Sequence, residues 1–214
     1  MIDVVIPVHN ALDHFKKMVE SLYLHTRRED YRLIIVDDAS DGETKKFIEG
    51  LDCDVRVENN KQLWFTRAVN IGLDNTTCSL IAALNTDIVL CEGWLGVFSE
   101  YFKDEKVMLA GSDYQPPRKG CTYPTHPDYV TGHCWMIRRW FLEEYGTLDE
   151  KHAHIDSDRH FSYEVNNRGF KVVRNHSLPI IHGTGPSWGR QIGKLPKAST
   201  LPPPNNRKLG TIST

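Results

Sequence analysis

The sequence has 214 residues, of which 40% are hydrophobic and 25% charged, and this length suits one globular domain with a sizeable core. It contains no run near the ~18 consecutive apolar residues of a membrane span and no signal-peptide pattern, so we expect a cytoplasmic protein without a membrane span. Its cysteines never occur in C-x-x-C spacing, which argues against a disulfide framework and a structural zinc site.

The formal net charge of −2 hides an uneven distribution. No acidic residue follows Glu164, whereas eight basic residues do, so the first 164 residues carry a formal charge of −10. This asymmetry suggests an acidic, metal-holding body and a basic segment that meets an anion such as a diphosphate. A solvated basic tail explains the charges equally well, and both interpretations stay open on charge alone.

Apolar runs and helical patterns alternate along the first half of the chain. The expected strands cover residues 2–8, 31–36, 55–58 and 80–84. The expected helices cover residues 11–24, 43–49 and 65–73. Because the strands are continuous apolar runs separated by helices, the pattern predicts an α/β fold with a Rossmann-like, mostly parallel central sheet and helices on both faces.

The second half of the chain is less regular. We expect helices at 93–102, 138–145 and 158–167, a strand at 107–110 and a loop over 112–133. Residues 1–193 are assigned to a single domain. From Lys194 onward Pro, Ser, Thr, Asn and Lys dominate, so residues 194–214 are expected to form a flexible tail or linker, as in a chain that is one piece of a longer protein with further domains.

Polar side chains follow the expected strands, and in doubly wound sheets ligands bind beyond the carboxyl ends of the strands. The first strand ends in Pro7, His9 and Asn10, with no glycine. A nicotinamide or flavin site needs G-x-G-x-x-G there, so that class of site is excluded. The second strand ends in Asp37 and Asp38, where a carboxylate can accept a hydrogen bond from a base or a ribose.

Further polar residues follow the second and fourth strands. The alternative for Asp38, Ser40 and Asp41 is that they only close a turn and cap the next helix, which explains Ser40 and Asp41 well but not Asp37. Asn85, Thr86 and Asp87 follow the fourth strand. Mg²⁺ or Mn²⁺ is held by one or two carboxylates together with phosphate oxygens and water, so Asp87 is enough to seat such an ion. An Asx turn that closes the strand is the alternative.

Four segments, taken in order, resemble the family 2 type of glycosyltransferase with a GT-A fold. They are VVIPVHN at 4–10, VDDASDG at 36–42, NNKQLWFTRAVNIGL at 59–73 and LNTDIVL at 84–90. The resemblance covers roughly residues 2–183, and the order and spacing of the segments make it specific. It implies an inverting, metal-dependent transfer of a hexose or deoxyhexose from a nucleoside-diphosphate donor, above all a UDP-sugar.

The resemblance also implies roles for residues on the donor side. Asp37 would pair with the uracil edge, and Asp38 would lie near the nucleoside. The other donor-binding residues would be Pro7, His9, Asn10, Arg67, Asn85, Thr86 and Asp87, of which Asp87 would coordinate Mn²⁺ or Mg²⁺. Asn85 stands where the family often has its first aspartate, so the cation is expected to arrive mainly with the nucleotide. Trp64 stands where the family commonly has glycine, and we expect it to pack against the following helix.

The acceptor side is implied by GHCWMIRR at 132–139 and YGTLDE at 145–150. These segments resemble the family's acceptor-side strand and its G-x-(F/L)-D-E turn. Trp135 is then a candidate for stacking on a sugar, and a buried core tryptophan is the alternative. Asp156 is a second acceptor-side candidate, with helix capping as its alternative.

Asp158 aligns with the family's catalytic base, and Ser157 stands where glutamate is usual. Inversion in one displacement needs a base on the face opposite the leaving nucleotide, and a positioned carboxylate supplies about 10²–10⁴-fold. In the segment IIHGTGPS at 180–187, His182 would complete the metal site, although a single histidine is usually structural. Arg190 and Lys194 would fold over the diphosphate.

Two other functions remain as alternatives. His152, His154 and Asp156 could hold zinc in a hydrolase, but alternate residues share a face only in an extended segment, and a helix is expected from Asp158. The second alternative is a non-catalytic sugar-nucleotide-binding domain, and the presence of Asp158 argues against it. The expected partners are a nucleotide-sugar donor and a glycan or other hydroxyl acceptor in glycan biosynthesis, with no nucleic acid.

Overall fold

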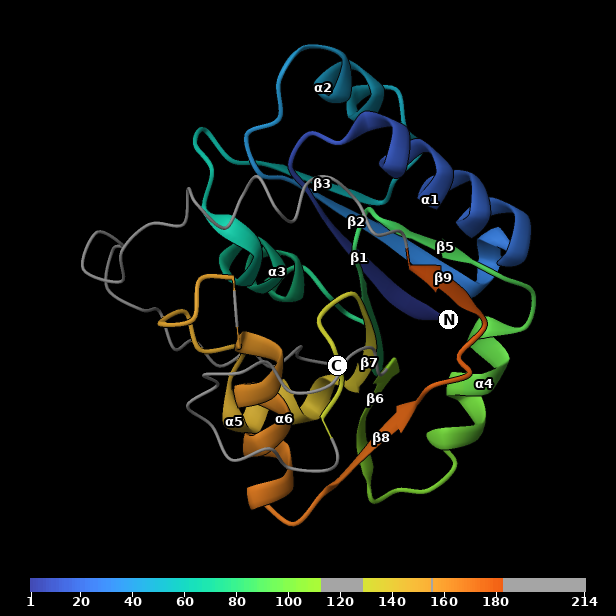
Figure 1. Ribbon diagram of the computed structural model, residues 1–214, viewed down its shortest axis with the longest axis vertical. Coiled ribbons are helices and arrows are strands. Elements are labelled where there is room, and N and C mark those ends of the chain that lie inside the picture. Colours follow the sequence, from blue (N-terminus) through green and yellow to red (C-terminus); the bar gives the residue numbers. More distant parts are fainter. Residues whose placement is uncertain (113–128, 155, 183–214) are drawn as a thin grey trace.

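The computed structural model describes residues 1–112, 129–154 and 156–182, which form a sheet covered by helices (Figure 1). The central sheet has seven strands in the order β3-β2-β1-β4-β7-β6-β8. These strands are β1 (Ile2–Val8), β2 (Tyr31–Asp37), β3 (Val55–Glu58), β4 (Leu80–Leu84), β6 (Val107–Ser112), β7 (Cys134–Arg138) and β8 (Lys171–Asn175). A separate two-stranded sheet pairs β5 (Ile88–Leu90) with β9 (Ile180–His182).

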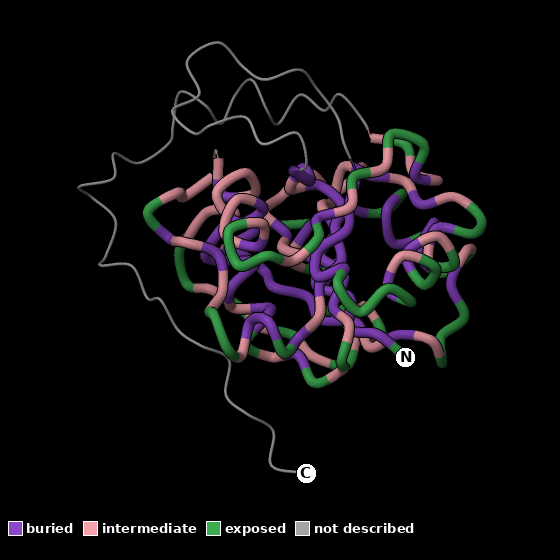
Figure 2. The backbone as a smooth tube through the Cα atoms, turned by 90° about the horizontal axis from the view of Figure 1, so that it is seen from below, coloured by how far each residue is buried: buried purple, intermediate pink, exposed green. Residues whose placement is uncertain are grey.

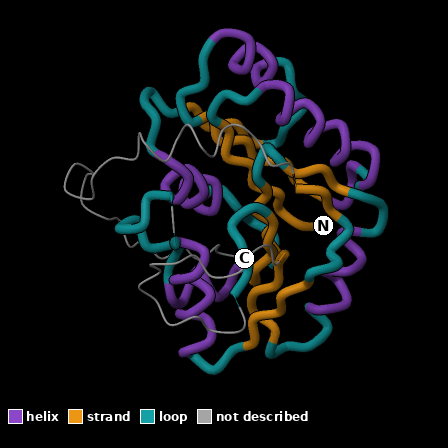
Figure 3. The backbone as a smooth tube through the Cα atoms, in the orientation of Figure 1, coloured by secondary structure: helices purple, strands orange, loops and turns teal. Residues whose placement is uncertain are grey.

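The helices lie on both faces of the central sheet (Figures 1 and 3). They are α1 (Leu12–His25), α2 (Gly42–Glu49), α3 (Trp64–Asp74), α4 (Trp94–Tyr101), α5 (Arg139–Tyr145) and α6 (Ser157–Asn167), with a short 3-10 helix, η1 (Arg28–Asp30). Helices α1, α2 and α4 cover one face, and α3, α5 and α6 cover the other. The predicted α/β fold is confirmed.

The central strand β1 pairs in parallel with both β2 and β4, and β2 pairs in parallel with β3. Strand β7 runs antiparallel to its neighbours β4 and β6, whereas β6 and β8 are again parallel. The sheet is therefore mostly parallel, as predicted. Because β1, β2 and β4 point the same way, their carboxyl ends lie side by side at one edge of the sheet.

Strands β1, β2 and β4 are buried on both faces, which explains why they read as continuous hydrophobic runs, whereas the edge strand β3 alternates between half-buried and exposed residues. Along β1, Val4 and Ile6 belong to the core shared with α1, α2 and α4, whereas Val5 belongs to the core shared with α3, α5 and α6. The buried residues accordingly lie along the middle of the molecule (Figure 2). Gly72 lets α3 approach β1, since a Cβ at this position would lie 2.2 Å from Cγ1 of Val5.

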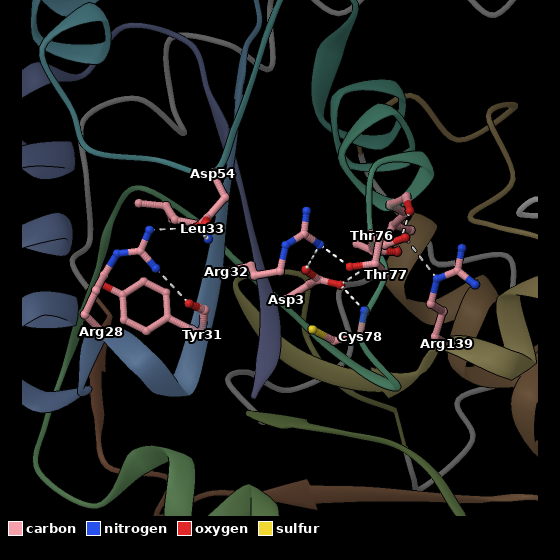
Figure 4. Close-up of polar contacts among 11 residues, drawn as sticks. Asp3, Arg28, Tyr31, Arg32, Leu33, Asp54, Thr76, Thr77, Cys78 and Arg139 are labelled. Carbon is pink, nitrogen blue, oxygen red and sulfur yellow. Dashed lines mark hydrogen bonds and ion pairs between the residues drawn. The ribbon is translucent and has the colours of Figure 1, made fainter. Parts of the chain in front are cut away.

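Asp3 organises the opposite edge of the sheet, where the parallel strands begin (Figure 4). Its carboxylate is 0% exposed and accepts the backbone N–H groups of Thr77 and Cys78, each at 2.6 Å. Nη1 of Arg32, at the start of β2, lies 2.7 Å from its Oδ1. The carboxylate thus ties β1 to β2 and to the loop that leads into β4, remote from the carboxyl edge.

The expected elements differ from the structure mainly in the second half of the chain. Strands β5, β8 and β9 are not predicted by the sequence pattern, since three to five residues show little periodicity and depend on distant partners. Most of the expected loop, residues 113–128, and the expected tail at 194–214 lie outside the described residues. Within the part that is described, every helix is too short or too polar to span a membrane.

Candidate functional site

A pocket opens at the edge of the sheet where β1, β2 and β4 end. The described residues that line it are Pro7, Val8, His9, Ala11, Asp38, Gln62, Trp64, Phe65, Ala68, Asn85, Thr86, Asp87 and His154. It therefore lies where ligands bind in doubly wound sheets. The expected donor residues that it brings together are Pro7, His9, Asp38, Asn85, Thr86 and Asp87.

Hydrogen bonds hold together the loops that follow β1 and β2, next to the pocket. The backbone N–H of Asn10 donates to Oγ of Ser40 at 3.0 Å, and the backbone N–H of Asp41 donates to Oδ1 of Asn10 at 2.9 Å. Nδ1 of His9 donates to the backbone oxygen of Asp38 at 2.7 Å. Asn10 therefore shapes the loop, whereas His9 itself lines the pocket.

The prediction that Ser40 and Asp41 cap α2 with their side chains is wrong for the described residues. The Ser40 hydroxyl is taken by Asn10, in the neighbouring loop. The backbone oxygen of Asp41, and not its carboxylate, accepts the N–H groups of Thr44 and Lys45 at 3.1 and 3.2 Å. The Ser40 hydroxyl and the backbone N–H of Asp41 instead join two loops at the sheet edge.

Asp38 holds the segment that leads into α3. Its carboxylate is 3% exposed and accepts three hydrogen bonds. Nδ2 of Asn59 and the backbone N–H of Leu63 donate to Oδ1 at 2.9 and 2.7 Å, and the backbone N–H of Trp64 donates to Oδ2 at 2.9 Å. Burial raises the pKa of Asp38, and the three bonds oppose that rise. The carboxylate thus fixes one wall of the pocket.

Asp37 also has a local structural role. It is 3% exposed, and its Oδ1 accepts the backbone N–H of Ser40 at 2.8 Å. The carboxylate closes the turn after β2, so the turn interpretation extends to Asp37 as well as to Ser40. Asp37 lies outside the pocket wall that the described residues form.

Trp64 adopts a backbone conformation that glycine favours. Its φ is 70°, in the left-handed region that larger residues rarely occupy, which gives a physical reason for the glycine expected at this position. Its side chain lines the pocket, and its ring meets that of His154 edge to face, with centroids 6.5 Å apart and 69° between planes. The expectation that Trp64 simply packs against α3 is therefore corrected.

Asp87 and His182 are brought together by the small sheet. Ile88 of β5 lies opposite His182 of β9, which places Oδ2 of Asp87 3.4 Å from Nε2 of His182. The buried Oδ1 of Asp87 has no hydrogen-bond partner among the described residues. A buried carboxylate oxygen is rarely left without a partner, so the orphaned Oδ1 beside an imidazole fits a divalent cation at this position.

The imidazole of His133 packs against that of His182. The two rings are stacked, with centroids 4.1 Å apart and 5° between planes. Nε2 of His133 lies 2.7 Å from Oγ of Ser112, and its Nδ1 lies 2.9 Å from Oγ1 of Thr131. Burial lowers the pKa of His133 to about 3, so this ring is neutral at physiological pH. Sequence reasoning does not identify His133 as a site residue, because only the fold brings it to His182.

Asp158 lies in the first turn of α6, and two backbone N–H groups bind its carboxylate. Gly132 donates to Oδ2 and Arg159 donates to Oδ1, each at 2.8 Å. Burial raises the pKa of Asp158, and both hydrogen bonds oppose that rise. A Cβ at Gly132 would lie 3.3 Å from Cζ of Phe65 and 3.6 Å from Oδ2 of Asp158. The carboxylate and the ring of Phe65, a residue of the pocket wall, therefore both lie close to Gly132.

The two acceptor-side candidates lie in different surroundings. Trp135 is 2% exposed in β7 and packs against Phe161, with ring centroids 5.9 Å apart. The sugar-stacking prediction for Trp135 is therefore wrong, because its side chain belongs to the core shared by β7 and α6. Asp156 precedes α6, and its backbone oxygen, and not its carboxylate, accepts the N–H of His160 at 2.9 Å. Side-chain capping by Asp156 is likewise not found in the described residues.

Arg67 differs from its expected placement. It is 7% exposed, and its Nε lies 3.1 Å from Oε2 of Glu150. Next to this pair, Nδ2 of Asn70 donates to the backbone oxygen of Leu148 at 2.9 Å. Because a buried guanidinium needs a carboxylate partner, Arg67 serves to fix the turn before α6 against α3, outside the described pocket wall.

The histidine-rich string is divided by the fold. His154 lines the pocket, whereas His152 turns to Asp149 and His160. Among the described residues, His152, His154 and Asp156 do not form one metal-ligand cluster, so the zinc-hydrolase geometry is not found. Gln62 and Phe65 line the pocket without having been named as site residues, although both lie in the segment 59–73 that carries the resemblance. His154, a candidate zinc ligand on the sequence alone, lines the same pocket. Arg190 and Lys194 lie outside the described residues.

Comparison with protein families gives a match over most of the chain. The model described as Glycosyl transferase family 2 matches residues 3–159. Two curated relatives, both described as "Pre-mycofactocin glycosyltransferase", come from the CDC 1551 / Oshkosh and ATCC 25618 / H37Rv strains of Mycobacterium tuberculosis. Each is 32% identical over 111 residues, which is 50% of this chain and 22% of the relative. The chain thus spans about a fifth of the length of these relatives.

Solved structures show the same fold. The mannosyltransferase PcManGT from Pyrobaculum calidifontis, in complex with GDP-Man and Mn²⁺, has a TM-score of 0.72 at 15% identity. That match covers 87% of this chain and 59% of PcManGT. GalNAc-T7 with UDP, GalNAc and Mn²⁺ has a TM-score of 0.69 at 18% identity, over 85% of this chain and 43% of GalNAc-T7. These similarities show that the chain has a GT-A fold.

Proposed function

Because the chain belongs to glycosyl transferase family 2, we propose that it is an inverting, metal-dependent glycosyltransferase. It transfers a hexose or deoxyhexose from a nucleoside-diphosphate donor, preferably a UDP-sugar, to a hydroxyl group of a glycan or other acceptor. The observation that carries the proposal is the orphaned Oδ1 of Asp87, at the wall of the pocket and beside His182.

The nucleotide is proposed to lie in the pocket at the carboxyl edge of the sheet. His9 and Trp64 line this pocket, and their rings are proposed to contact the nucleotide. Asp38 holds the loop that carries Trp64. For Asp37 to accept the imide N–H of uracil, it would use Oδ2, since its Oδ1 is bonded to Ser40. Uracil presents such a donor, but so does thymine, so the preference for UDP rests on the family resemblance.

Asp87 and His182 are proposed to hold the cation. One carboxylate and one imidazole leave most coordination positions to phosphate oxygens and water, as is usual for Mg²⁺ and acceptable for Mn²⁺. When bound, such an ion supplies charge neutralisation to the leaving diphosphate. Asn85 and Thr86 add neutral oxygens to the same wall. Because Asn85 adds no charge, the protein alone is proposed to bind metal weakly and the nucleotide to strengthen it.

Asp158 is proposed as the general base for the acceptor hydroxyl. The N–H groups of Gly132 and Arg159 fix its orientation, and its raised pKa makes it a better proton acceptor than an ordinary aspartate. A base on the face opposite the leaving group gives inversion at the anomeric carbon. Asp156 is proposed to meet the acceptor, and Arg190 and Lys194 to approach the diphosphate.

Turnover of nucleotide sugars by two aspartate variants tests this function. Asp158→Asn should reduce UDP release from a UDP-sugar by about 10²–10⁴-fold while keeping nucleotide affinity. Asp87→Ala should instead weaken metal-dependent nucleotide binding. Asp13→Asn, an exposed carboxylate on α1, is the control and should change neither.

Near-native turnover by Asp158→Asn would contradict the assignment of the base. A wild-type protein that binds a nucleotide sugar without ever transferring its sugar would instead favour a non-catalytic binding domain.

A further inference from the structure

Asp149, His152 and His160 form a cluster that the proposed donor site does not use. One potential ligand atom from each residue lies within 4.8 Å of the other two. The imidazoles of His152 and His160 have their centroids 5.2 Å apart, with 32° between planes. All three residues are half-buried, two of them in the turns after α5 and one in the first turn of α6.

We propose that Asp149, His152 and His160 form a second divalent-metal site, selective for zinc-type ions, which joins the turn at 149–152 to α6. Two imidazoles and one carboxylate match the ligand preference of Zn²⁺ rather than that of Mg²⁺ or Ca²⁺. Zinc-ligand bonds of about 2.0–2.2 Å place tetrahedral ligands about 3.4 Å apart, so the cluster closes on the ion by small side-chain rotations. A water molecule takes the fourth position.

The backbone around the cluster is already ordered by hydrogen bonds. The N–H of His152 donates to the backbone oxygen of Asp149 at 3.1 Å, and the N–H of Lys151 donates to Oδ1 of Asp149 at 3.0 Å. These bonds present two of the ligands from one turn. Oε1 of Glu164 lies 4.0 Å from Nε2 of His160, on the next turn of α6.

The same segment also contacts α3 and leads into the pocket wall. Thr66, near the start of α3, donates through its backbone N–H to the oxygen of Ala153 at 3.1 Å and through its hydroxyl to the oxygen of His152. His154, which follows, lines the pocket, and Asp158 lies two residues before His160. An ion held by the cluster would therefore join the turn that leads to His154 to the helix that carries Asp158. This site does not depend on sugar transfer and stands apart from Asp87.

Zinc binding by the tag-free full chain tests the proposal. The Asp87→Ala variant serves as the background, so that the donor site does not contribute. After removal of metal, titration with Zn²⁺ is expected to show one equivalent bound per chain, and Co²⁺ is expected to give the visible absorption of a tetrahedral ion. Both signals should be lost in His160→Ala and in Asp149→Asn. His176→Ala, an exposed histidine outside the cluster, should keep both.

Amide hydrogen exchange keeps the test independent of folding defects in any one variant. Zn²⁺ should slow exchange of the amides at 149–154 in the Asp87→Ala protein and leave them unchanged in His160→Ala. A background protein that binds no Zn²⁺ would overturn the proposal, as would His160→Ala and Asp149→Asn proteins that still bind a full equivalent.

Discussion

The imidazole of His182 lies flat on that of His133, with ring centroids 4.1 Å apart and 5° between the ring planes. His133 is itself held by the hydroxyl groups of Ser112 and Thr131. The stack therefore restrains the orientation of the His182 imidazole, which faces Asp87.

We predict that His133→Ala weakens Mn²⁺-dependent nucleotide binding by about 10–100-fold, because outer partners of metal ligands contribute on this scale. His133→Phe keeps a flat ring against His182 and should restore most of the affinity. Dissociation constants from calorimetry with Mn²⁺ present give the comparison. Equal affinities for wild type and His133→Ala would show that the stack does not position His182.

A second prediction concerns the pH dependence of turnover. Burial raises the pKa of Asp158 above its ordinary value of 3.8, and the base must be ionised to act. The rate should therefore rise with pH through a pKa above that value. Since the folded state binds this proton more tightly than the unfolded chain, ionisation of Asp158 also lowers the free energy of unfolding as pH rises. A pH profile of kcat/KM whose acid limb falls at or below the ordinary value would contradict this.

Trp64 allows a test of backbone strain at the pocket wall. A non-glycine residue in the left-handed region costs roughly 1–2 kcal/mol. We predict that Trp64→Gly is more stable than Trp64→Ala by about 1 kcal/mol, the reverse of the usual order in helices. Both variants should bind nucleotide more weakly than wild type, since both lose the ring. Denaturant unfolding measures the first effect, and an alanine variant as stable as the glycine variant would argue against the strain.

Substitution of Asp3 is expected to lower the stability of the protein without changing nucleotide binding. Asp3→Ala leaves Arg32 and two backbone N–H groups without their buried partner, so the free energy of unfolding should fall by about 3 kcal/mol. Nucleotide affinity of the folded variant should not change, because Asp3 lies at the opposite edge of the sheet from the pocket. Asp30→Asn, which weakens the exposed pair with Arg27, is the control and should have little effect on stability. A large loss of affinity in Asp3→Ala would contradict the separation of the two edges.

The sequence predicts those helices and strands that are long enough to show a clear hydrophobic pattern. Strand β1 and helix α3 follow from apolar runs and helical spacing, and the pocket follows from the rule on strand ends. Chemistry-bearing residues close to those ends, such as Asp87, were found in the same way.

Periodicity and the rule on strand ends could not predict contacts between distant segments, although the family resemblance placed His182 at the metal site with Asp87. The pairing of Ile88 with His182 depends on two strands of three residues each, and the stack on His133 depends on that pairing. The roles that the family resemblance implies for Trp135 and Arg67 also differ from the structure, because an aromatic ring or a guanidinium suits a ligand as well as it suits a buried partner.

Calorimetric titration of UDP into wild type and Asp87→Ala, with and without Mn²⁺, tests the central claim most directly. GDP and dTDP serve as competing nucleotides. We predict that UDP binds wild type in a Mn²⁺-dependent manner and more tightly than GDP or dTDP, and that Asp87→Ala removes the metal dependence. If wild type with Mn²⁺ binds none of the three nucleotides, or if Asp87→Ala binds UDP and Mn²⁺ as wild type does, the donor site proposed at the ends of β1, β2 and β4 is contradicted.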